Sequence, residues 1–257
     1  MKKVLITSTL ILATIASYAQ TVPAGKTYKA TLQSKGTTTM TMQGNDMEIP
    51  TTVDEAVEVK ITGSNNGNVA GIATITSLKL TVSSMGQERT ITSDDPAIRS
   101  NPEVAKLLKP QDFQLKNGKI VNAQNVNASM QATSTDVASK LVLPVSGNNL
   151  KPNYTWKESI SDSTGSTADM NFTITKLTAD EVEISFVNTI KSNVTKQQNG
   201  MDAKINLTGT LQGTRTYDRA TGVLKTENTT IDMKGTTEMM GQESPTTLKG
   251  TTSMTVN

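Results

Sequence analysis

The residue types that carry most enzyme chemistry are missing from this sequence, because its 257 residues include no histidine and no cysteine. Their absence excludes imidazole general bases, Ser/His and Cys/His nucleophile pairs, and the usual zinc sites. An enzyme built on this chain would have to work with carboxylates, lysine or tyrosine. No phosphate-binding glycine loop, Ser/Lys dyad spacing or glycosidase-like pair is visible. We therefore expect a protein that is not an enzyme, with no catalytic residue, no metal site and no cofactor.

The acidic residues gather at three places. Two groups lie on strand-like segments, where alternation with apolar neighbours indicates a solvated sheet face; they are Asp54, Glu55 and Glu58, and Asp180, Glu181 and Glu183. The third group, Asp94 and Asp95, precedes Pro96 where a strand ends and a helix begins. Turn chemistry explains that pair, and a calcium site is the alternative.

Methionine is the unusual residue of this chain. Many of the 12 methionines lie beside glycine-containing turns, namely Met40, Met42, Met47, Met85, Met201, Met239 and Met240. Packing in the core is the first interpretation. The alternatives are a soft apolar surface for a ligand or for a protein partner at the hairpin tips, and a Cu(I) site.

Residues 203 to 239 form the clearest predicted element, a long β-hairpin. Apolar residues and glycines alternate with polar residues in the first arm, which places Ala203, Ile205, Leu207, Gly209, Leu211, Gly213 and Tyr217 on one face. After the turn DRATG the pattern resumes with Val223, Ile231, Met233 and Met239, opposite Leu224, Thr226 and Asn228. We predict that Gly209 and Gly213 are bends or bulges that curve the sheet.

The same alternation recurs along the chain and sets the fold class. We predict an all-β, mostly antiparallel protein in which two similar curved meander halves form one barrel-like or sandwich-like unit, with one or two short helices. The first half covers 20–121 and contains a short helix near 101–109, the connection covers 122–153, and the second half covers 154–257. The recurrence of MGQE at 85–88 and 240–243, each time at a predicted tip, suggests an internal repeat. Threonine, suited to exposed strand faces, is abundant throughout.

The first residues resemble a secretory signal peptide. Lys2 and Lys3 precede an apolar run that ends at Ala19, with small residues at the two positions that a signal peptidase reads. We therefore expect residues 1–19 to be removed by cleavage after Ala19. No cysteine follows, so the protein is not expected to be a lipoprotein, and no membrane span is expected after cleavage. The mature chain should be secreted or periplasmic.

Charge gives no sign of a nucleic-acid partner. The chain has 25 Lys and Arg against 23 Asp and Glu, and because Lys2 and Lys3 belong to the signal segment, 23 basic residues remain against 23 acidic ones. A neutral mature chain has no net attraction for nucleic acid or for an anionic membrane surface.

Several features together resemble an uncharacterised family. The signal segment, the DDP at 94–96, the hairpin QLKNGKIVNAQ, the PNYTW that begins the second half and the YDRATGVL hairpin are similar to a domain-of-unknown-function family of secreted all-β proteins from Gram-negative bacteria. The resemblance covers essentially the mature chain. It implies an all-β fold and a location outside the cytoplasm, but no biochemical activity. A curved antiparallel sheet with a short helix near its open side is also similar, at the level of architecture, to the lipoprotein-carrier half-barrels.

A curved sheet with one apolar face needs a second sheet or a lid, and any part left open becomes a binding cavity. If the helix at 101–109 covers that face loosely, the candidate lining is Val104, Leu107, Leu108, Phe172, Phe186 and Tyr217. The expected function is a secreted, non-catalytic binding protein for an apolar small molecule or lipid. The alternative is a structural or surface-interaction protein with a filled core and no ligand.

Overall fold

A computed structural model describes residues 22–42, 44–65, 67–84, 86–100, 102–121, 134–161, 165–198 and 201–257. The predicted signal peptide at 1–19 and the first part of the predicted connection, residues 122–133, lie outside the described residues. In the part that is described, no helix is both long and apolar enough to cross a membrane.

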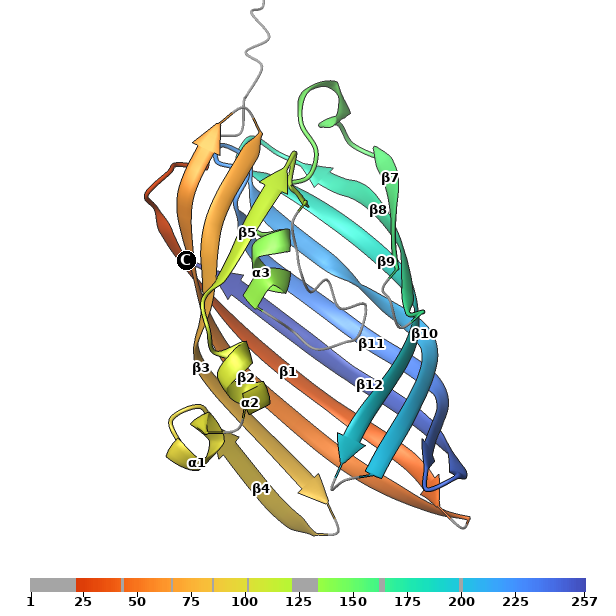
Figure 1. The fold of residues 1–257 in the computed structure, drawn as a ribbon. Helices are drawn as coiled ribbons and strands as arrows, with labels where there is room; N and C mark the ends of the chain where they lie inside the picture. Colours follow the sequence, from red (N-terminus) through yellow and green to blue (C-terminus); the bar gives the residue numbers. More distant parts are fainter. Residues whose placement is uncertain are drawn as a thin grey trace, which may run out of the picture.

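The described strands form a 12-stranded antiparallel sheet (Figure 1). Its order is β6-β5-β3-β2-β1-β12-β11-β10-β9-β8-β7, with β4 paired to β3. The strands are β1 (Thr27–Met42), β2 (Asn45–Asn65), β3 (Asn68–Ser84), β4 (Gln87–Thr92), β5 (Gln111–Lys116), β6 (Lys119–Ile120), β7 (Thr155–Ser161), β8 (Thr167–Leu177), β9 (Glu181–Gln198), β10 (Met201–Asp218), β11 (Leu224–Met239) and β12 (Gln242–Val256).

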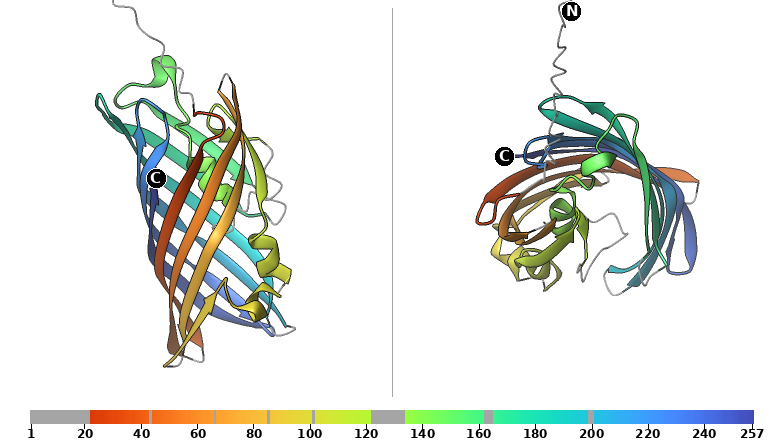
Figure 2. Two further views of the ribbon diagram at one scale, coloured as in Figure 1. Left: turned by 90° about the vertical axis from the view of Figure 1, so that its left-hand side faces the viewer. Right: turned by 90° about the horizontal axis from the view of Figure 1, so that it is seen from above.

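This arrangement confirms the predicted fold class. The first and second halves meet where β1 pairs with β12, with Leu32 opposite Met254, so both belong to one continuous sheet. The order begins at β6 and ends at β7, and these two edges do not pair with each other in the described chain. The sheet curves into an open half-barrel, which makes the unit barrel-like rather than sandwich-like (Figure 2).

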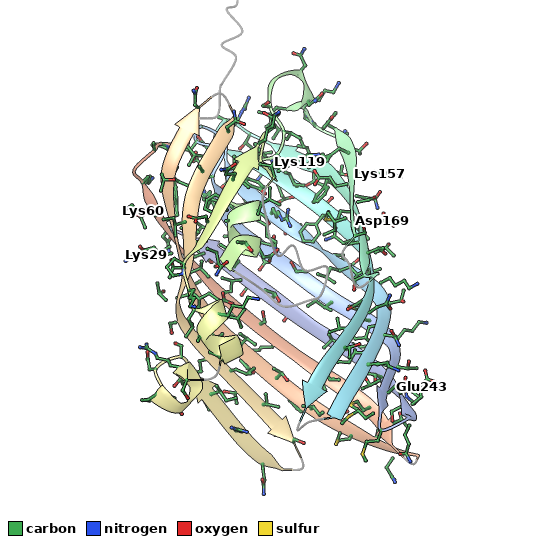
Figure 3. The ribbon with its side chains drawn as sticks, in the orientation of Figure 1. Lys29, Lys60, Lys119, Lys157, Asp169 and Glu243 are labelled. Carbon is green, nitrogen blue, oxygen red and sulfur yellow. The ribbon has the colours of Figure 1, made fainter. Side chains whose placement is uncertain are left out.

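We call the concave side of the sheet the inner face. It carries the main core, including Leu32 of β1, Val57 of β2, Ile184 of β9 and Tyr217 of β10, all at most 5% exposed. The opposite, outer face carries the polar residues that alternate with these. Figure 3 shows outer-face charges such as Lys29, Lys60 and Lys157 along the outline of the molecule. The strict two-residue period of the strands therefore sorts the sequence onto two faces.

The described residues also contain short helices. They are α1 (Pro96–Arg99), α2 (Pro102–Leu107), α3 (Ser134–Lys140) and the 3-10 turn η1 (Gly147–Asn149). The helix predicted near 101–109 is α2. However, the main helix contacts with the strands come from α3, chiefly with β2, β3 and β5, while α2 contributes Leu107 at the edge of the core. The element that covers the core thus comes from the predicted connection.

We call α3 and the chain that follows it to Val145 the plug. It buries several apolar side chains in the core: Val137, Ala138, Leu141, Val142, Leu143 and Val145. Backbone bonds fix the plug to the β10–β11 hairpin, because Leu224 N donates to Leu141 O at 2.8 Å and Leu143 N donates to Gly222 O at 2.8 Å. The plug therefore fills one end of the half-barrel (Figure 1).

The predicted hairpin at 203–239 is confirmed as β10 and β11, with one correction. The register shifts between Thr216 and Tyr217, so that Leu224 pairs with Tyr217 and is 1% exposed. The sequence pattern had placed Leu224 on the polar face. An irregularity of one residue reverses which side chains point inward, and simple alternation cannot anticipate it.

Inner-face glycines allow the sheet to bend. A Cβ on Gly209 would overlap Asp232 O, and one on Gly235 would overlap Asn206 O, so neighbouring backbones approach these positions too closely for any side chain. Gly250 and Gly71 are similar, with carbonyl oxygens 2.6 Å and 2.5 Å from an ideal Cβ. The register of β10 is continuous through Gly209 and Gly213, so the predicted feature there is a bend and not a bulge.

Candidate functional site

The predicted ligand lining is only partly brought together. Phe172, Phe186 and Tyr217 are buried in the main core, and Leu107 and Leu108 pack against the same core from its edge. Val104 is half-buried. Phe172 stacks on Trp156, the only tryptophan, with ring centroids 4.9 Å apart. These residues thus belong to the packed end of the half-barrel that the plug fills.

A second apolar cluster lies on the inner face, beyond the main core. We call it the inner-face patch; its buried members are Ala168, Ile190, Leu207 and Met233, and the partly buried residues around them are Ile160, Ile205, Leu211, Ile231 and Leu248. Strands β7 to β12 contribute to it. The strand contacts of α3 are chiefly with β2, β3 and β5, so the patch is displaced from the helix that seals the core.

Between the core and the patch, charged side chains meet on the inner face. We call Glu227, Arg215, Lys140 and Asp136 the charged cluster. Arg215 Nε donates to Glu227 Oε2 at 2.5 Å, and Lys140 Nζ donates to Glu227 Oε1 at 3.0 Å. Lys140 also pairs with Asp136 Oδ2 at 2.9 Å. The cluster ties α3 to β10 and β11.

The surroundings hold these charges in their ionised forms. Burial raises the pKa of Glu227, but Lys140 and Arg215 outweigh it and bring that pKa down to about 2. Burial lowers the pKa of Lys140, and Asp136 and Glu227 outweigh it and raise the pKa above its ordinary value. The Arg215 guanidinium lies 4.8 Å from the ring centroid of Phe186 and 5.7 Å from that of Phe172. Such rings stabilise a partly desolvated cation.

Glu55 of β2 is a separate feature of the inner face. It pairs with Leu32 and Leu78 across the strands and is 4% exposed. Burial, and then the negative charge of Asp136, raise the pKa of Glu55 to about 7. Its Oε1 atom has no hydrogen-bond partner within the described chain. With a pKa of about 7, this carboxyl group exchanges between its protonated and ionised forms near neutral pH.

Sequence reasoning missed these charged residues. The sequence predicts a solvated sheet face for Glu55 together with Asp54 and Glu58, and this prediction is wrong for Glu55, which shares the buried face of Val57 and is 4% exposed. Glu227 and Arg215 interrupt an apolar face, and the alternation of apolar and polar residues does not predict that charged side chains at such positions are buried. A signal was present in Arg215, which sits between Gly213 and Tyr217 on the face that the sequence predicted to be buried.

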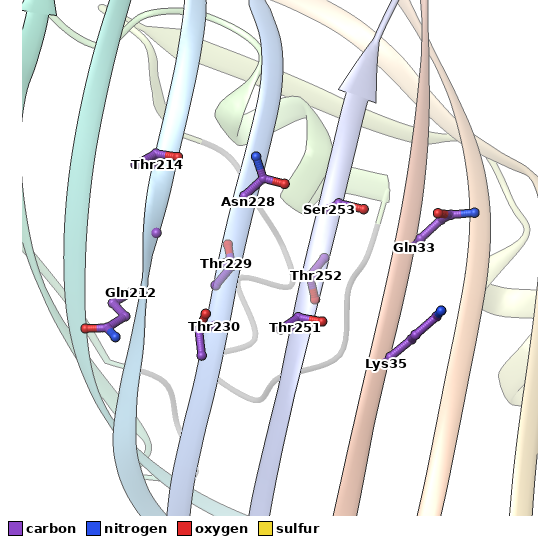
Figure 4. A pocket seen from close by; sticks show the side chains of 11 residues that line it. Gln33, Lys35, Gln212, Thr214, Asn228, Thr229, Thr230, Thr251, Thr252 and Ser253 are labelled. Atoms are coloured by element: carbon purple, nitrogen blue, oxygen red, sulfur yellow. The ribbon is translucent and has the colours of Figure 1, made fainter.

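The outer face carries a polar hollow of about 530 Å³ where β1, β12, β11 and β10 run side by side (Figure 4). Its outward side chains are Gln33, Lys35, Gln212, Thr214, Asn228, Thr230, Thr251 and Ser253. A sheet that curves across its strands and bends along them is saddle-shaped, which leaves a hollow on the outside. This hollow is not the apolar cavity that the sequence predicted.

Within the described residues, no group of three or more Asp or Glu is placed to hold an ion. Asp94 pairs with Arg99 at 3.3 Å in the turn that joins β4 to α1. Among the methionines, Met40 and Met47 face each other across the β1–β2 hairpin, and Met240 is 78% exposed at the β11–β12 turn. The MGQE at 240–243 and the described part of the other, residues 86–88, lie at hairpin turns, as predicted.

With this geometry in place, the chain can be compared with known proteins. Residues 142–224 match a family of unknown function, DUF6263. The DUF6263 segment contains the PNYTW and YDRATGVL motifs, and its ends meet in space because Val142 and Val223 form a β-bridge. It covers a smaller part of the chain than the resemblance implied. A comparison with curated proteins finds no match.

A search of solved structures returns matches that include the following two. A structure of lipovitellin, from work on its lipid–protein interactions, has a TM-score of 0.50 and 10% identity, over 91% of this chain and 25% of that chain. This chain therefore spans about a quarter of lipovitellin, and the likeness is one of fold. An outer membrane channel from Pseudomonas putida F1 has a TM-score of 0.25 and 9% identity, over 94% of this chain and 98% of that chain. That score is too low to establish a shared fold.

Proposed function

We propose that this protein is a non-catalytic binding protein that holds an apolar or lipid-like ligand against the inner face of its half-barrel. The observation that carries the proposal is the inner-face patch, whose partly exposed side chains include Ile231 and Leu248. Apolar side chains on a concave surface are the common lining of small-molecule sites. Each such side chain is stabilised by about 1.5–3 kcal/mol when it leaves water.

The position of the patch supports the proposal. The plug completes the core at one end of the half-barrel, and the patch occupies the inner face away from it. A protein that needed only a filled core would have polar residues at these positions, as it does on the outer face. The fold likeness to lipovitellin, whose structure was determined to study lipid–protein interactions, adds circumstantial support.

The charged cluster favours binding over catalysis. Acid–base catalysis by carboxylates needs one protonated and one free ionised group close to the substrate. Here Glu227 is held by Arg215 and Lys140, and Asp136 is held by Lys140. These carboxylates serve the attachment of α3 to the sheet.

The proposal includes a location outside the cytoplasm, which is inferred from the signal-like residues 1–19. Intact-mass measurement of the protein from the extracytoplasmic fraction of its host should give a chain beginning at Gln20. A mass that retains residues 1–19 would contradict this part of the proposal.

The binding proposal is tested by native mass spectrometry of that protein, with a lipid extract analysed beside it. We expect a bound apolar species at a fixed stoichiometry, and uptake of a neutral fluorescent probe such as N-phenylnaphthylamine. A bare polypeptide that takes up no probe would favour the rival function, a structural or surface-interaction protein.

Variants locate the site. Ile231→Asn places an amide in the patch and should weaken probe binding about tenfold, because the loss of apolar contact is worth about 1.4 kcal/mol or more. The matched control is Val187→Asn on the outer face of β9, where the valine is 44% exposed. Equal loss of binding in both variants would place the probe elsewhere.

A further inference from the structure

Apolar side chains of the inner-face patch lie in a row across the strands. In the register of the sheet, each of the following residues lies directly opposite the next: Ile160 of β7, Ala168 of β8, Ile190 of β9, Gly209 of β10, Met233 of β11 and Leu248 of β12. The row continues past the patch, because Thr38 of β1 lies opposite Leu248, and Ile49 of β2 lies opposite Thr38. We call these residues the cross-strand row. Thr38 has the one polar side chain among them.

Along the strands, polar residues soon interrupt the apolar surface. On the inner face of β9, buried Asn188 and Ser192 lie on either side of Ile190. On β11, buried Thr229 and Thr237 bound the apolar stretch that contains Met233. Strand β10 is the exception, since its inner face remains apolar toward its first residues. The apolar surface is therefore short in the strand direction and long in the direction across the strands.

The surface around the row is uncharged over the described part of the strands from β9 across to β2. The inner-face positions next to the row on these strands hold apolar residues, glycine, serine, threonine and one asparagine. Farther along β10 and β11 lie Arg215 and Glu227, which already pair with each other. An ionised group placed on the row would lose its hydration without gaining a counter-ion, which is unfavourable. An uncharged part of a ligand therefore matches this surface.

The dimensions of the row favour a long, thin occupant. Met233 forms the floor and is 0% exposed, whereas Leu248 in the row and Ile231 beside it are partly buried. Neighbouring strands are about 4.8 Å apart, so the stretch of the row that crosses from β9 to β1 is about 19 Å long. A linear hydrocarbon chain can follow such a stretch over its whole length, whereas a compact ring system covers part of it.

We infer that the ligand of the inner face is a lipid with a long linear hydrocarbon chain, and that this chain lies across the strands on the cross-strand row, centred on Met233. The inference rests on the proposed function and names the ligand class for the same site. Each methylene group that lies on the row leaves water and adds to the affinity. Affinity should therefore increase with chain length, and it should depend on side chains at both ends of the stretch from β9 to β1.

The first test uses alkyl maltosides, which share one uncharged head and differ in the length of the chain. Octyl, decyl, dodecyl and tetradecyl maltoside each displace bound N-phenylnaphthylamine, at concentrations below those at which they form micelles. We expect the Kd to fall about tenfold for every two carbons added, up to tetradecyl maltoside.

Two variants then distinguish a chain that lies across the strands from one that lies along β10. Leu248→Asn changes the cross-strand row and should weaken the binding of tetradecyl maltoside about tenfold. The matched control is Ile205→Asn, which changes a partly buried residue of the same patch that lies on β10 away from the row. Ile205→Asn should leave the binding unchanged.

A gain of affinity provides a test that poor folding cannot imitate. Thr38→Val makes the row apolar from β11 to β2 and should tighten the binding of tetradecyl maltoside about threefold. Thr39→Val is the control, because Thr39 is the next residue of the same strand and lies on the outer face. It should have no effect on the Kd.

The outcomes separate the inference from the proposed function. An affinity that does not rise with chain length, a loss in Ile205→Asn but not in Leu248→Asn, or no gain in Thr38→Val would overturn the inference and leave an apolar site in place. Maltosides that fail to displace a bound probe would do the same. Failure of N-phenylnaphthylamine to bind at all would overturn the proposed function and the inference with it.

Discussion

Arg215 and Glu227 face each other directly across the β10–β11 hairpin, and Arg215 Nε lies 2.5 Å from Glu227 Oε2. The same hairpin contains a second cross-strand ion pair, Lys204 and Glu238, at 3.3 Å. The glutamate side chain is 4% exposed in the first pair and 39% exposed in the second. One hairpin thus offers a buried and an exposed version of the same interaction.

Glu227→Gln should destabilise the protein by about 3 kcal/mol or more, because it leaves Arg215 and Lys140 without their shared counter-ion in a largely desolvated site. Urea unfolding followed by circular dichroism measures the change. Glu238→Gln is the control and should change the free energy of unfolding by less than about 1 kcal/mol. Similar changes in the free energy of unfolding at the two positions would show that burial does not determine how much an ion pair stabilises this hairpin.

The free energy of unfolding should fall as pH rises from about 4.5 to about 7, because of Glu55. Glutamate in the unfolded chain ionises near 4.5, whereas burial and Asp136 raise the pKa of folded Glu55 to about 7. Between these values the folded state keeps a proton that the unfolded state has lost, so stability decreases with pH, by up to about 3 kcal/mol. In Glu55→Gln, the urea midpoint of unfolding should change less with pH across this range. An equally steep decline in that variant would assign the effect to another group.

At lower pH the opposite sign applies, because of Glu227. Arg215 and Lys140 hold the pKa of folded Glu227 at about 2 despite its burial, below the ordinary value of 4.5. The folded state therefore binds fewer protons than the unfolded state in this interval, and stability is lost as pH falls from about 4.5 toward 2. A protein that kept constant stability down to pH 2 would contradict this account of the charged cluster.

Gly235→Ala should destabilise the sheet by about 2 kcal/mol, because its new methyl group would overlap Asn206 O on the neighbouring strand. Gly63→Ala is the control, since the nearest atom to a Cβ there is 4.0 Å away. Thermal unfolding of the two variants gives the comparison. Tolerance of alanine at Gly235 would mean that the bend does not depend on close approach of the backbones.

Leu141→Ala should cost about 2–5 kcal/mol, as expected for a leucine deleted from a packed core. Leu141 is 0% exposed and lies in the plug. Val121→Ala, at a residue that is 57% exposed, should be nearly neutral. If Leu141→Ala unfolds α3 without changing the main unfolding transition, the plug is a separate unit and not part of the core.

The sequence by itself determined the strands, the turns and the fold class. Alternation with period two is a local property, and side chains such as Leu207 and Thr208 already differ in polarity before any partner strand is known. Turn residues are equally local: in the hairpin QLKNGKIVNAQ, Asn117 and Gly118 both have positive φ, as a two-residue type I′ turn requires. The absence of histidine and cysteine likewise limited the chemistry without reference to the fold.

Only the tertiary structure decided which element closes the core and where the buried charges lie. Whether α3 or α2 covers the core depends on the position of each helix relative to the sheet. The local sequence pattern of a helix does not contain that position. The meeting of Lys140 with Glu227, 87 residues apart, depends on the curvature of the sheet and on the docking of α3. Because burial and charge pairing are properties of the assembled sheet, Glu55 and Glu227 could be recognised as buried only after folding placed them side by side with their neighbours.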